Sequence, residues 1–509
     1  MKRVLVVGAG HNGLLAAIHL AAHGLDVTVL EHAPHPGGAT RTEQLTLPGF
    51  LHDHCAGFVP MAAASEAITE LELERDGLSW IDPPVAMAHP FEDGSAIALH
   101  RSVEATLASL GPAGPGWEAA MRTMLPLAEP LIQSILSPLA PVRQPLRLAA
   151  GLRGELALWS RRLLGSVEAL GLDLFAGERR ASAWLAGSAQ HSGLSPSTSG
   201  SGAFGFLLQL MAHSHGWPLP RGGMAELAGA LLRRAEARGA RIRCSAPVTR
   251  LLLRRGRVAG VALANGEQLG ADAVLTTVSA GVLARMLPDD ALPAGVRRQL
   301  ARWRYGTGAF KLDYALSAPV PWQAIEAREA AVVHVGGELD ELTAAAQAGA
   351  RGELPRRPAL VVGQQSLLDP SRAPAGRQTL YVYAHVPADY SAPDEHVAGL
   401  IEAQLERFAP GFSATVLARA IRSPAQSERE NPSLVGGDLG GGSYELDQQL
   451  IFRPTPRLSR YRTPIRGLFV AGASTHPGGA VHGISGRGAA RALLREGRLI
   501  PWRSGGGRG

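Results

Sequence analysis

Residues 4–13 read VLVVGAGHNG, and this stretch decides the fold of the chain. Four apolar residues are followed by Gly8, Gly10 and Gly13 in the spacing Gly-x-Gly-x-x-Gly, and then by a helix-like segment. A second apolar run, Val27–Leu30, ends at Glu31. A strand, a glycine-rich turn, a helix and a second strand in this order predict one βαβ unit of a parallel sheet.

Each part of this motif suits the binding of a dinucleotide. Gly8 permits a tight turn, Gly10 lets the backbone approach a pyrophosphate, and Gly13 lets the helix pack closely on the strand. The amino terminus of the helix offers free N–H groups and a partial positive charge to the phosphates. Glu31 lies 18 residues after the last glycine and is expected to accept hydrogen bonds from ribose hydroxyls.

A second stretch, residues 200–205 (GSGAFG), has the same glycine spacing but a different context. The residues before it, Ser195–Ser199 (SPSTS), are unsuited to a buried strand. We interpret this stretch as a loop and predict that the chain has a single dinucleotide site.

Composition excludes several classes of protein. The chain has 509 residues and only two cysteines, Cys55 and Cys244, which favours a reducing, cytoplasmic compartment and excludes a disulfide framework. The 50 basic and 44 acidic residues are mixed without a basic stripe, so no nucleic-acid partner is expected. The sequence has no run of roughly 18 apolar residues, so we predict no membrane span. His52–His54 (HDH) carries successive side chains toward opposite faces, so we predict no metal site.

The pattern along the chain predicts an α/β protein in which one domain is interrupted by another. We assign a Rossmann-like domain, a parallel sheet with helices on both faces, to residues 1–65, 215–285 and 445–509. An inserted α+β substrate domain takes 66–214, expected to be helical, and 286–444. Strands are expected at Ala240–Val248 and on both sides of an Asn265–Gly266 turn, and the tail Ser504–Gly509 is expected to be disordered.

Other glycine-rich segments resemble a known family. Residues 36–42 (PGGATRT) are similar to the glycine pair after the second strand in flavin amine oxidases and carotenoid desaturases. Residues 218–224 (PLPRGGM), 431–442 (NPSLVGGDLGGG) and 471–479 (AGASTHPGG) resemble the phytoene-dehydrogenase-like branch of that superfamily. The resemblance runs from the first strand to about Leu494 and implies an oxidoreductase with FAD bound non-covalently.

The same resemblance implies further contacts with the cofactor. One group lies along the pyrophosphate and ribityl chain: Gly37, Gly38, Thr40 and Arg41. Val248, at the end of a strand, would meet the adenine through its backbone. A last group lies beside the isoalloxazine, where a helix points at the pyrimidine end of the ring: Gly472, Gly478, Gly479 and Val481.

The family's reaction is the oxidation of a C–C or C–N single bond, with hydride transfer to flavin N5. The implied substrate is a small, lipophilic or polyene-like molecule. With one dinucleotide site, the electrons would pass to oxygen or a quinone, unless the reaction is a redox-neutral isomerisation. The resemblance supplies no proton acceptor; His482 and His215 are the candidates because each lies in a segment that resembles the family's.

Three alternatives stay open at this point. A flavin amine oxidase should show an aromatic pair flanking the flavin, and no such motif stands near Gly478 in the sequence. A lipid carrier similar to the Rab GDP-dissociation inhibitors would not need the intact glycine motifs. The Arg-rich helical stretch at residues 128–175 predicts either an ordinary amphipathic outer face or a peripheral membrane contact. The substrate, the electron acceptor and the oligomeric state do not follow from the sequence.

Overall fold

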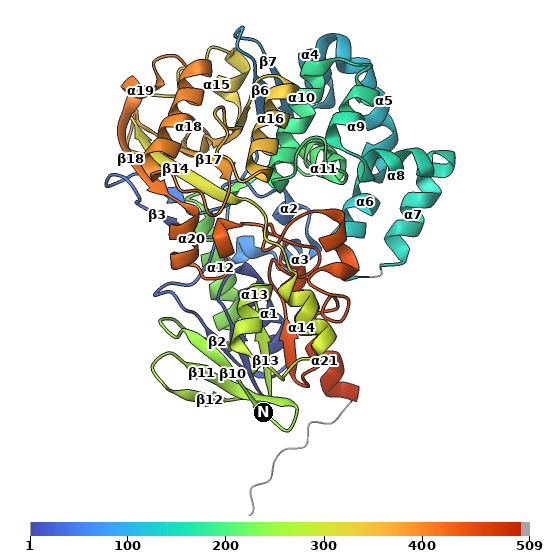
Figure 1. Ribbon diagram of the computed structural model, residues 1–509, viewed down its shortest axis with the longest axis vertical. Helices are drawn as coiled ribbons and strands as arrows, with labels where there is room; N and C mark the ends of the chain where they lie inside the picture. Colours follow the sequence, from blue (N-terminus) through green and yellow to red (C-terminus); the bar gives the residue numbers. More distant parts are fainter. Residues whose placement is uncertain (1, 140, 500–509) are drawn as a thin grey trace, which may run out of the picture.

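The computed structural model describes residues 2–139 and 141–499, so the tail expected to be disordered lies outside the described residues. Figure 1 shows a lower part that carries the N-terminal strand and the last helix, and two upper lobes. One upper lobe is built on a large sheet covered by helices, and the other consists of helices.

The lower part is organised by a parallel sheet in which all four neighbouring pairs are parallel. Its five strands, in spatial order, are β19 (Leu468–Val470), β13 (Ala273–Thr276), β1 (Arg3–Val7), β2 (Asp26–Leu30) and β9 (Arg241–Arg243). Alternate residues of β1 point into two different hydrophobic cores. Val4 and Val6 lie in one core, and Leu5 and Val7 lie in the other. Both faces are therefore buried, which is why this strand is apolar throughout.

Helices cover both faces of this sheet. Three of them share the core of Val4 and Val6: α1 (His11–Ala22), α12 (Met224–Ala237) and α21 (Ile484–Leu499). Two others pack on the opposite face: α13 (Ala280–Met286) and α14 (Ala294–Ala301). The expected Rossmann-like architecture is confirmed.

The prediction of one strand at Ala240–Val248 was wrong. Strand β9 ends at Arg243, Ser245 has a φ of 50°, and a separate strand β10 (Val248–Arg254) then begins. It forms a three-stranded antiparallel sheet with β11 (Arg257–Leu263) and β12 (Gln268–Gly270). Val248 therefore begins a strand instead of ending one, and the turn at residues 265–266 joins β11 to β12 rather than to β13.

The second sheet is antiparallel except where β15 pairs with β6. Its seven strands, in spatial order, are β18 (Val416–Arg422), β14 (Gly308–Leu316), β17 (Gln378–Val386), β16 (Leu360–Gly363), β15 (Val332–Val335), β6 (Val85–Pro90) and β7 (Ala96–His100). Strands β6 and β7 fall in the segment expected to be helical. Their short, Ala-containing runs lack the strict alternation that identifies a half-buried strand.

The helical lobe consists mainly of eight helices between residues 103 and 214. They are α4 (Val103–Leu110), α5 (Gly114–Met124), α6 (Ala128–Ile135), α7 (Arg143–Leu152), α8 (Leu156–Leu164), α9 (Val167–Leu174), α10 (Arg179–Ala189) and α11 (Ser201–Ser214). Within residues 2–139 and 141–499, no helix is long and apolar enough to cross a membrane.

The prediction of a loop at residues 200–205 was wrong, because α11 begins at Ser201. Its glycines serve close packing between helices. A Cβ on Gly202 would come within 2.6 Å of the Arg162 carbonyl oxygen, and one on Gly205 within 2.9 Å of the Leu185 carbonyl oxygen. Turns, not a buried strand, precede this helix, so the sequence argument against a second dinucleotide motif is unaffected.

Candidate functional site: a glycine-lined cradle at the carboxyl edge of the parallel sheet

The turn after β1 requires its first and last glycines for steric reasons. Gly8 has a φ of 98°, and a Cβ there would lie 2.3 Å from Thr277 Oγ1. A Cβ on Gly13 would lie 1.9 Å from the Gly8 carbonyl oxygen, so only glycine lets α1 approach the turn this closely. Helix α1 then begins at His11 without a side-chain cap, which leaves its first N–H groups available to a ligand.

Gly10 lies directly beside the second glycine-rich segment. The Gly37 N–H donates to the Ala9 carbonyl at 2.9 Å, and a Cβ on Gly38 would lie 3.2 Å from Gly10 Cα. A Cβ on Gly10 itself would meet nothing nearer than the Gly37 carbonyl oxygen at 3.9 Å. The two segments thus form one cradle with open space at Gly10.

Thr40 and Arg41 fold the second segment back on itself. The buried Thr40 hydroxyl donates to the Gly37 carbonyl at 2.7 Å, and Arg41 Nε donates to the Gly38 carbonyl at 3.1 Å. The Thr40 hydroxyl is therefore used by the protein, and the other Arg41 nitrogens also have protein partners, Glu43 at 3.5 Å and His54 at 3.2 Å.

Glu31 is buried at the end of β2, and its carboxylate joins the glycine turn. It accepts hydrogen bonds from the Ala9 N–H at 2.6 Å and from the Ala33 N–H at 2.9 Å. Each oxygen keeps a further lone pair that could accept from a ribose hydroxyl. The Ala246 N–H donates to the Glu31 carbonyl at 2.8 Å, which brings the start of β10, with the half-buried Val248, to the same edge of the sheet.

The C-terminal motif reaches the cradle through Asn12. The Asn12 side-chain oxygen accepts from the Ser485 hydroxyl at 2.8 Å and from the Gly486 N–H at 3.3 Å. The Gly472 N–H donates to Ser485 Oγ at 3.1 Å, and a Cβ on Gly472 would lie 2.4 Å from the Thr277 carbonyl oxygen. The first and last helices therefore begin side by side.

Gly478 and Gly479 pack against an aromatic pair that the sequence analysis missed. A Cβ on Gly478 would lie 3.2 Å from a ring carbon of Tyr444, and one on Gly479 would lie 2.6 Å from the Tyr444 hydroxyl. The Tyr444 ring meets Phe204 edge to face with centroids 4.8 Å apart. No such motif stands near Gly478 in the sequence; the pair forms only in the folded chain, because the two rings come from segments 240 residues apart. Val481 is buried just beyond these glycines, three residues before α21.

A buried arginine, Arg453, holds this corner together. It is 0% exposed and donates hydrogen bonds to four backbone carbonyls: those of Ala473 at 3.0 Å, Ser443 at 3.1 Å, Gly440 at 2.5 Å and Gly442 at 3.3 Å. Its guanidinium also lies over the rings of Trp303 and Tyr444. A lone Arg between two loops gives no periodic signal, so the sequence offered no means of finding it.

The two histidines predicted as proton acceptors lie in different surroundings. His482 is fully buried; one ring nitrogen lies 3.1 Å from the Gly478 carbonyl, and the other accepts from the Ile484 N–H at 3.1 Å. His215 directly follows α11 and lies 2.9 Å from the Ser214 hydroxyl and 3.5 Å from Glu129. Within the described chain, no hydrogen bond or ion pair joins His215 to the glycine cradle. The contacts of His482 favour a structural role, and both catalytic assignments stay predictions.

A charged cluster on the inner face of the large sheet is a further addition. Lys311 and Asp313 alternate along β14, and Lys311 Nζ lies 2.5 Å from Asp313 Oδ1. Burial raises the pKa of Asp313, and Lys311 opposes that shift. Nearby, Asp53 accepts from Arg372 at 2.7 Å, and His52 Nδ1 lies 3.6 Å from Asp313 Oδ1. Two charges two residues apart in an apolar strand were a signal that the sequence analysis overlooked.

His52, Asp53 and His54 have different partners, as the alternation along an extended segment predicts. In residues 2–139 and 141–499, no group of three or more His, Cys, Asp or Glu side chains is placed to hold a metal ion.

Comparison with known proteins shows the family to which this fold and site belong. Residues 13–494 match the family described as flavin containing amine oxidoreductase. Hydroxyneurosporene desaturase of Cereibacter sphaeroides is 29% identical, over 97% of this chain and 98% of that protein. Pyridine nucleotide-disulfide oxidoreductase domain-containing protein 2 of Rattus norvegicus is also 29% identical, over 97% and 93%. A triple mutant of putrescine oxidase has the same fold, with a TM-score of 0.65, 15% identity and coverage of 98% and 99%.

The parallel sheet, the glycine cradle and the paired helix starts define a flavin-dependent oxidoreductase of the Rossmann-like class. The chain belongs to the flavin containing amine oxidoreductase family, and its cofactor is FAD. The residues present fit that cofactor, because α1 begins uncapped beside open space at Gly10 and the Glu31 carboxylate faces the same turn.

Buried neutral histidines should make this protein sensitive to acid. Burial lowers the pKa of His52 and His482 to about 3 and that of His89 to about 4. Below pH 6.5 the unfolded chain binds protons that the folded protein excludes, so stability present above pH 6.5 is lost as the pH falls toward 4. Each such histidine should lower the unfolding free energy by about 1.4 kcal/mol per pH unit.

Urea unfolding at several pH values between 6.0 and 5.0 checks this expectation. The substitution His89→Gln should reduce the slope of unfolding free energy against pH by about 1.4 kcal/mol per unit, whatever it does to stability at neutral pH. An unchanged slope would show that His89 is protonated in the folded protein.

Proposed function

We propose that this protein is a desaturase or dehydrogenase that oxidises a C–C single bond of a small, lipophilic, polyene-like substrate. Bound FAD supplies a hydride acceptor at N5. The observation that carries the proposal is the convergence of both chain ends on one cradle. Similarity to a carotenoid desaturase over 97% of the chain supports this choice of substrate class.

The chain's own residues would position the cofactor in three places. The uncapped start of α1 would bind the pyrophosphate beside Gly10, and the Glu31 carboxylate would accept hydrogen bonds from the ribose. Gly478 and Gly479 allow close approach of the ring, held in shape by Tyr444. By the resemblance described above, the start of α21, after Val481, would present its positive dipole end to the pyrimidine side and would stabilise negative charge there by about 0.3–2 kcal/mol.

The remaining assignments follow the same proposal. Thr40 and Arg41 shape the segment along the ribityl chain, and the backbone at Val248 lies by the adenine. The single dinucleotide motif requires a diffusible electron acceptor, oxygen or a quinone. We retain the domain division proposed above for the strands, since the five parallel strands all fall within residues 1–65, 215–285 and 445–509. Helix α14 lies in the 286–444 part but packs in the core of the parallel sheet, so we propose moving it to the Rossmann-like domain.

Amine oxidation is the second candidate, because Tyr444 and Phe204 form an aromatic pair at Gly478 and Gly479. An anaerobic experiment distinguishes the two functions. FAD-loaded protein is mixed with a panel of polyenes and, separately, with a panel of primary amines. We expect polyenes to bleach the flavin absorbance and amines to leave it unchanged. Bleaching by amines alone would replace the first proposal with the second, and product formation without bleaching would indicate an isomerase.

We further propose a peripheral membrane contact through α7 and α8. Val142 is 68% exposed, Leu146 64% and Leu164 57%, and arginines such as Arg147 share these helices. Exposed apolar side chains beside arginines suit an anionic lipid surface. The protein should float with vesicles that contain anionic lipid, and a Val142→Asp, Leu146→Asp double variant should float less. Absence of the wild-type protein from the vesicle fraction with and without anionic lipid would end this idea.

A further inference from the structure

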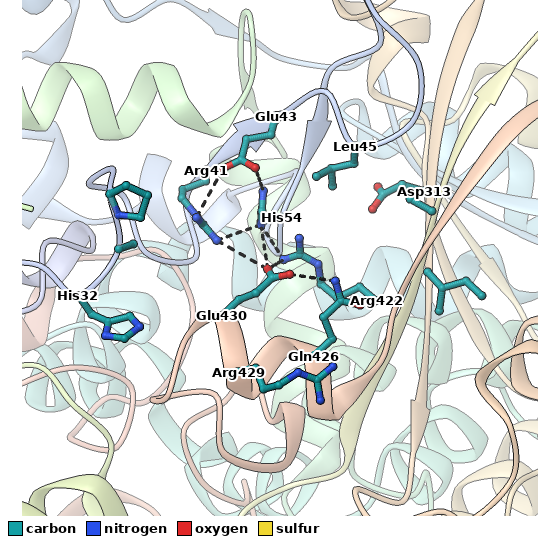
Figure 2. Close-up of a pocket in the computed structure, with 14 residues that line it drawn as sticks. His32, Arg41, Glu43, Leu45, His54, Asp313, Arg422, Gln426, Arg429 and Glu430 are labelled. Atoms are coloured by element: carbon teal, nitrogen blue, oxygen red, sulfur yellow. Dashed lines mark hydrogen bonds and ion pairs between the residues drawn. The ribbon is translucent and has the colours of Figure 1, made fainter. Parts of the chain in front are cut away.

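A pocket separate from the glycine cradle opens between the two sheets (Figure 2). Its volume is about 400 Å³, within the range of sites for small organic ligands. Four parts of the chain line it: the loop after β2, the hairpin of β3 (Thr42–Glu43) and β4 (His52–Asp53), strands β14 and β18, and α20 (Pro424–Glu430). Its lining includes none of the glycines proposed to hold FAD, although it shares Arg41 with the segment placed along the ribityl chain.

Two arginines in this pocket already have carboxylate partners. Arg422 Nη1 lies 3.0 Å from Glu430 Oε2, and Arg41 Nη1 lies 3.5 Å from Glu43 Oε1. Both guanidinium groups also approach the buried His54, whose Nδ1 lies 2.6 Å from Arg422 and 3.2 Å from Arg41 (Figure 2). Burial and the two arginines lower the pKa of His54 to about 2, so it is a neutral acceptor and adds no charge.

A third arginine, Arg429, is left over. It lines the pocket from the end of α20, and in the described part of the chain no carboxylate forms an ion pair with it. The pocket's remaining acid, Asp313, is matched by Lys311 at 2.5 Å. With Glu43 and Glu430 set against Arg41 and Arg422, the pocket carries one positive charge without an internal counter-ion. Leu45 and Ile421 add apolar surface beside it.

We propose that this pocket binds a small organic carboxylate with a short apolar body. The carboxylate bridges Arg429 and Arg422 and takes the place of Glu430 as the partner of Arg422. Glu430 can turn toward solvent because its side chain is 32% exposed, at the cost of its 3.0 Å hydrogen bond from Gln426. A carboxylate suits guanidinium groups better than an alcohol does, because charge-assisted hydrogen bonds are about twice as strong as neutral ones.

Calorimetric titration of the FAD-saturated protein with hexanoate, 1-hexanol and hexylammonium tests the proposal. Hexanoate should bind at one site, and the other two should bind at least about tenfold more weakly. Arg429→Gln should weaken hexanoate about tenfold, whereas Glu430→Gln should strengthen it severalfold by removing the internal competitor. Arg238→Gln, at the far end of α12, is the matched control and should leave the affinity unchanged.

Opposite effects of the two pocket substitutions are not expected from a general loss of structure. Equal affinity for hexanoate and hexanol, no effect of Arg429→Gln, or hexanoate binding only to FAD-free protein would overturn the proposal. A competition experiment between hexanoate and a substrate found by flavin bleaching identifies the source of the natural carboxylate. Competition assigns the carboxylate to the substrate, and simultaneous binding assigns it to a separate ligand. The titration measures binding itself, so it does not depend on which bond the enzyme oxidises.

Discussion

The substitution Gly10→Val should remove FAD from the protein while leaving the polypeptide folded. Gly10 has a φ of −70°, which valine can adopt, and a Cβ there meets no atom nearer than 3.9 Å. The branched side chain would instead fill the open space beside the uncapped N–H groups of α1, where we place the pyrophosphate. We expect the purified variant to contain less than about a tenth of the stoichiometric flavin, measured by absorbance after denaturation.

Gly295→Val is the matched control, because Gly295 lies on the exposed side of α14, near its start, and a Cβ there meets nothing within 4 Å. Both variants should keep the wild-type circular dichroism spectrum, and only the first should lose colour. If Gly10→Val retained FAD at full stoichiometry, the cofactor would have to lie elsewhere, and the proposed reaction would lose its foundation.

The substitution Arg453→Met should destabilise the protein by about 3–5 kcal/mol, measured by urea unfolding. Methionine fills much of the same volume but donates nothing, so the carbonyls of Ala473, Ser443 and Gly440 would be left buried without this donor. Those carbonyls belong to the two segments that shape the ring end of the cradle. FAD affinity should therefore fall together with stability.

Arg351→Met provides the comparison, because Arg351 is 58% exposed and pairs only with the exposed Glu353. Its loss should change stability by less than about 0.5 kcal/mol. Arg453→Lys should lie between the two, since lysine keeps the charge but not the planar fork that reaches several carbonyls at once. A loss below about 1 kcal/mol for Arg453→Met would mean that water replaces the guanidinium at this corner.

The phosphate end of the cradle was predictable from sequence because its determinants are local. Gly8, Gly10 and Gly13 stand at fixed spacing within one strand, turn and helix, and Glu31 ends the very next strand. The ring end was predictable only as segments that resemble a family. Its supporting residues, Tyr444 and Arg453, gain their roles from contacts across long stretches of chain, which no local spacing encodes.

The errors also have local physical causes. Gly202 and Gly205 looked like loop residues, but glycine is equally suited to places where a helix meets a carbonyl oxygen of its neighbour. The apparent strand from residue 240 to 248 is two strands, because Ser245 adopts a left-handed conformation that breaks the run. Lys311 and Asp313 did carry a readable signal, since unpaired charges are not tolerated in a buried strand and each therefore implied the other.

The contact between Asn12 and Ser485 bears on how the protein matures. A ribosome delivers the glycine turn at Asn12 long before Ser485 at the start of α21, since 473 positions separate the two residues. Until then, the ring end of the cradle is missing, and flavin could be gripped only by its phosphates and adenosine. Secure loading of the coenzyme therefore waits until α21 has been made and can pack beside α1.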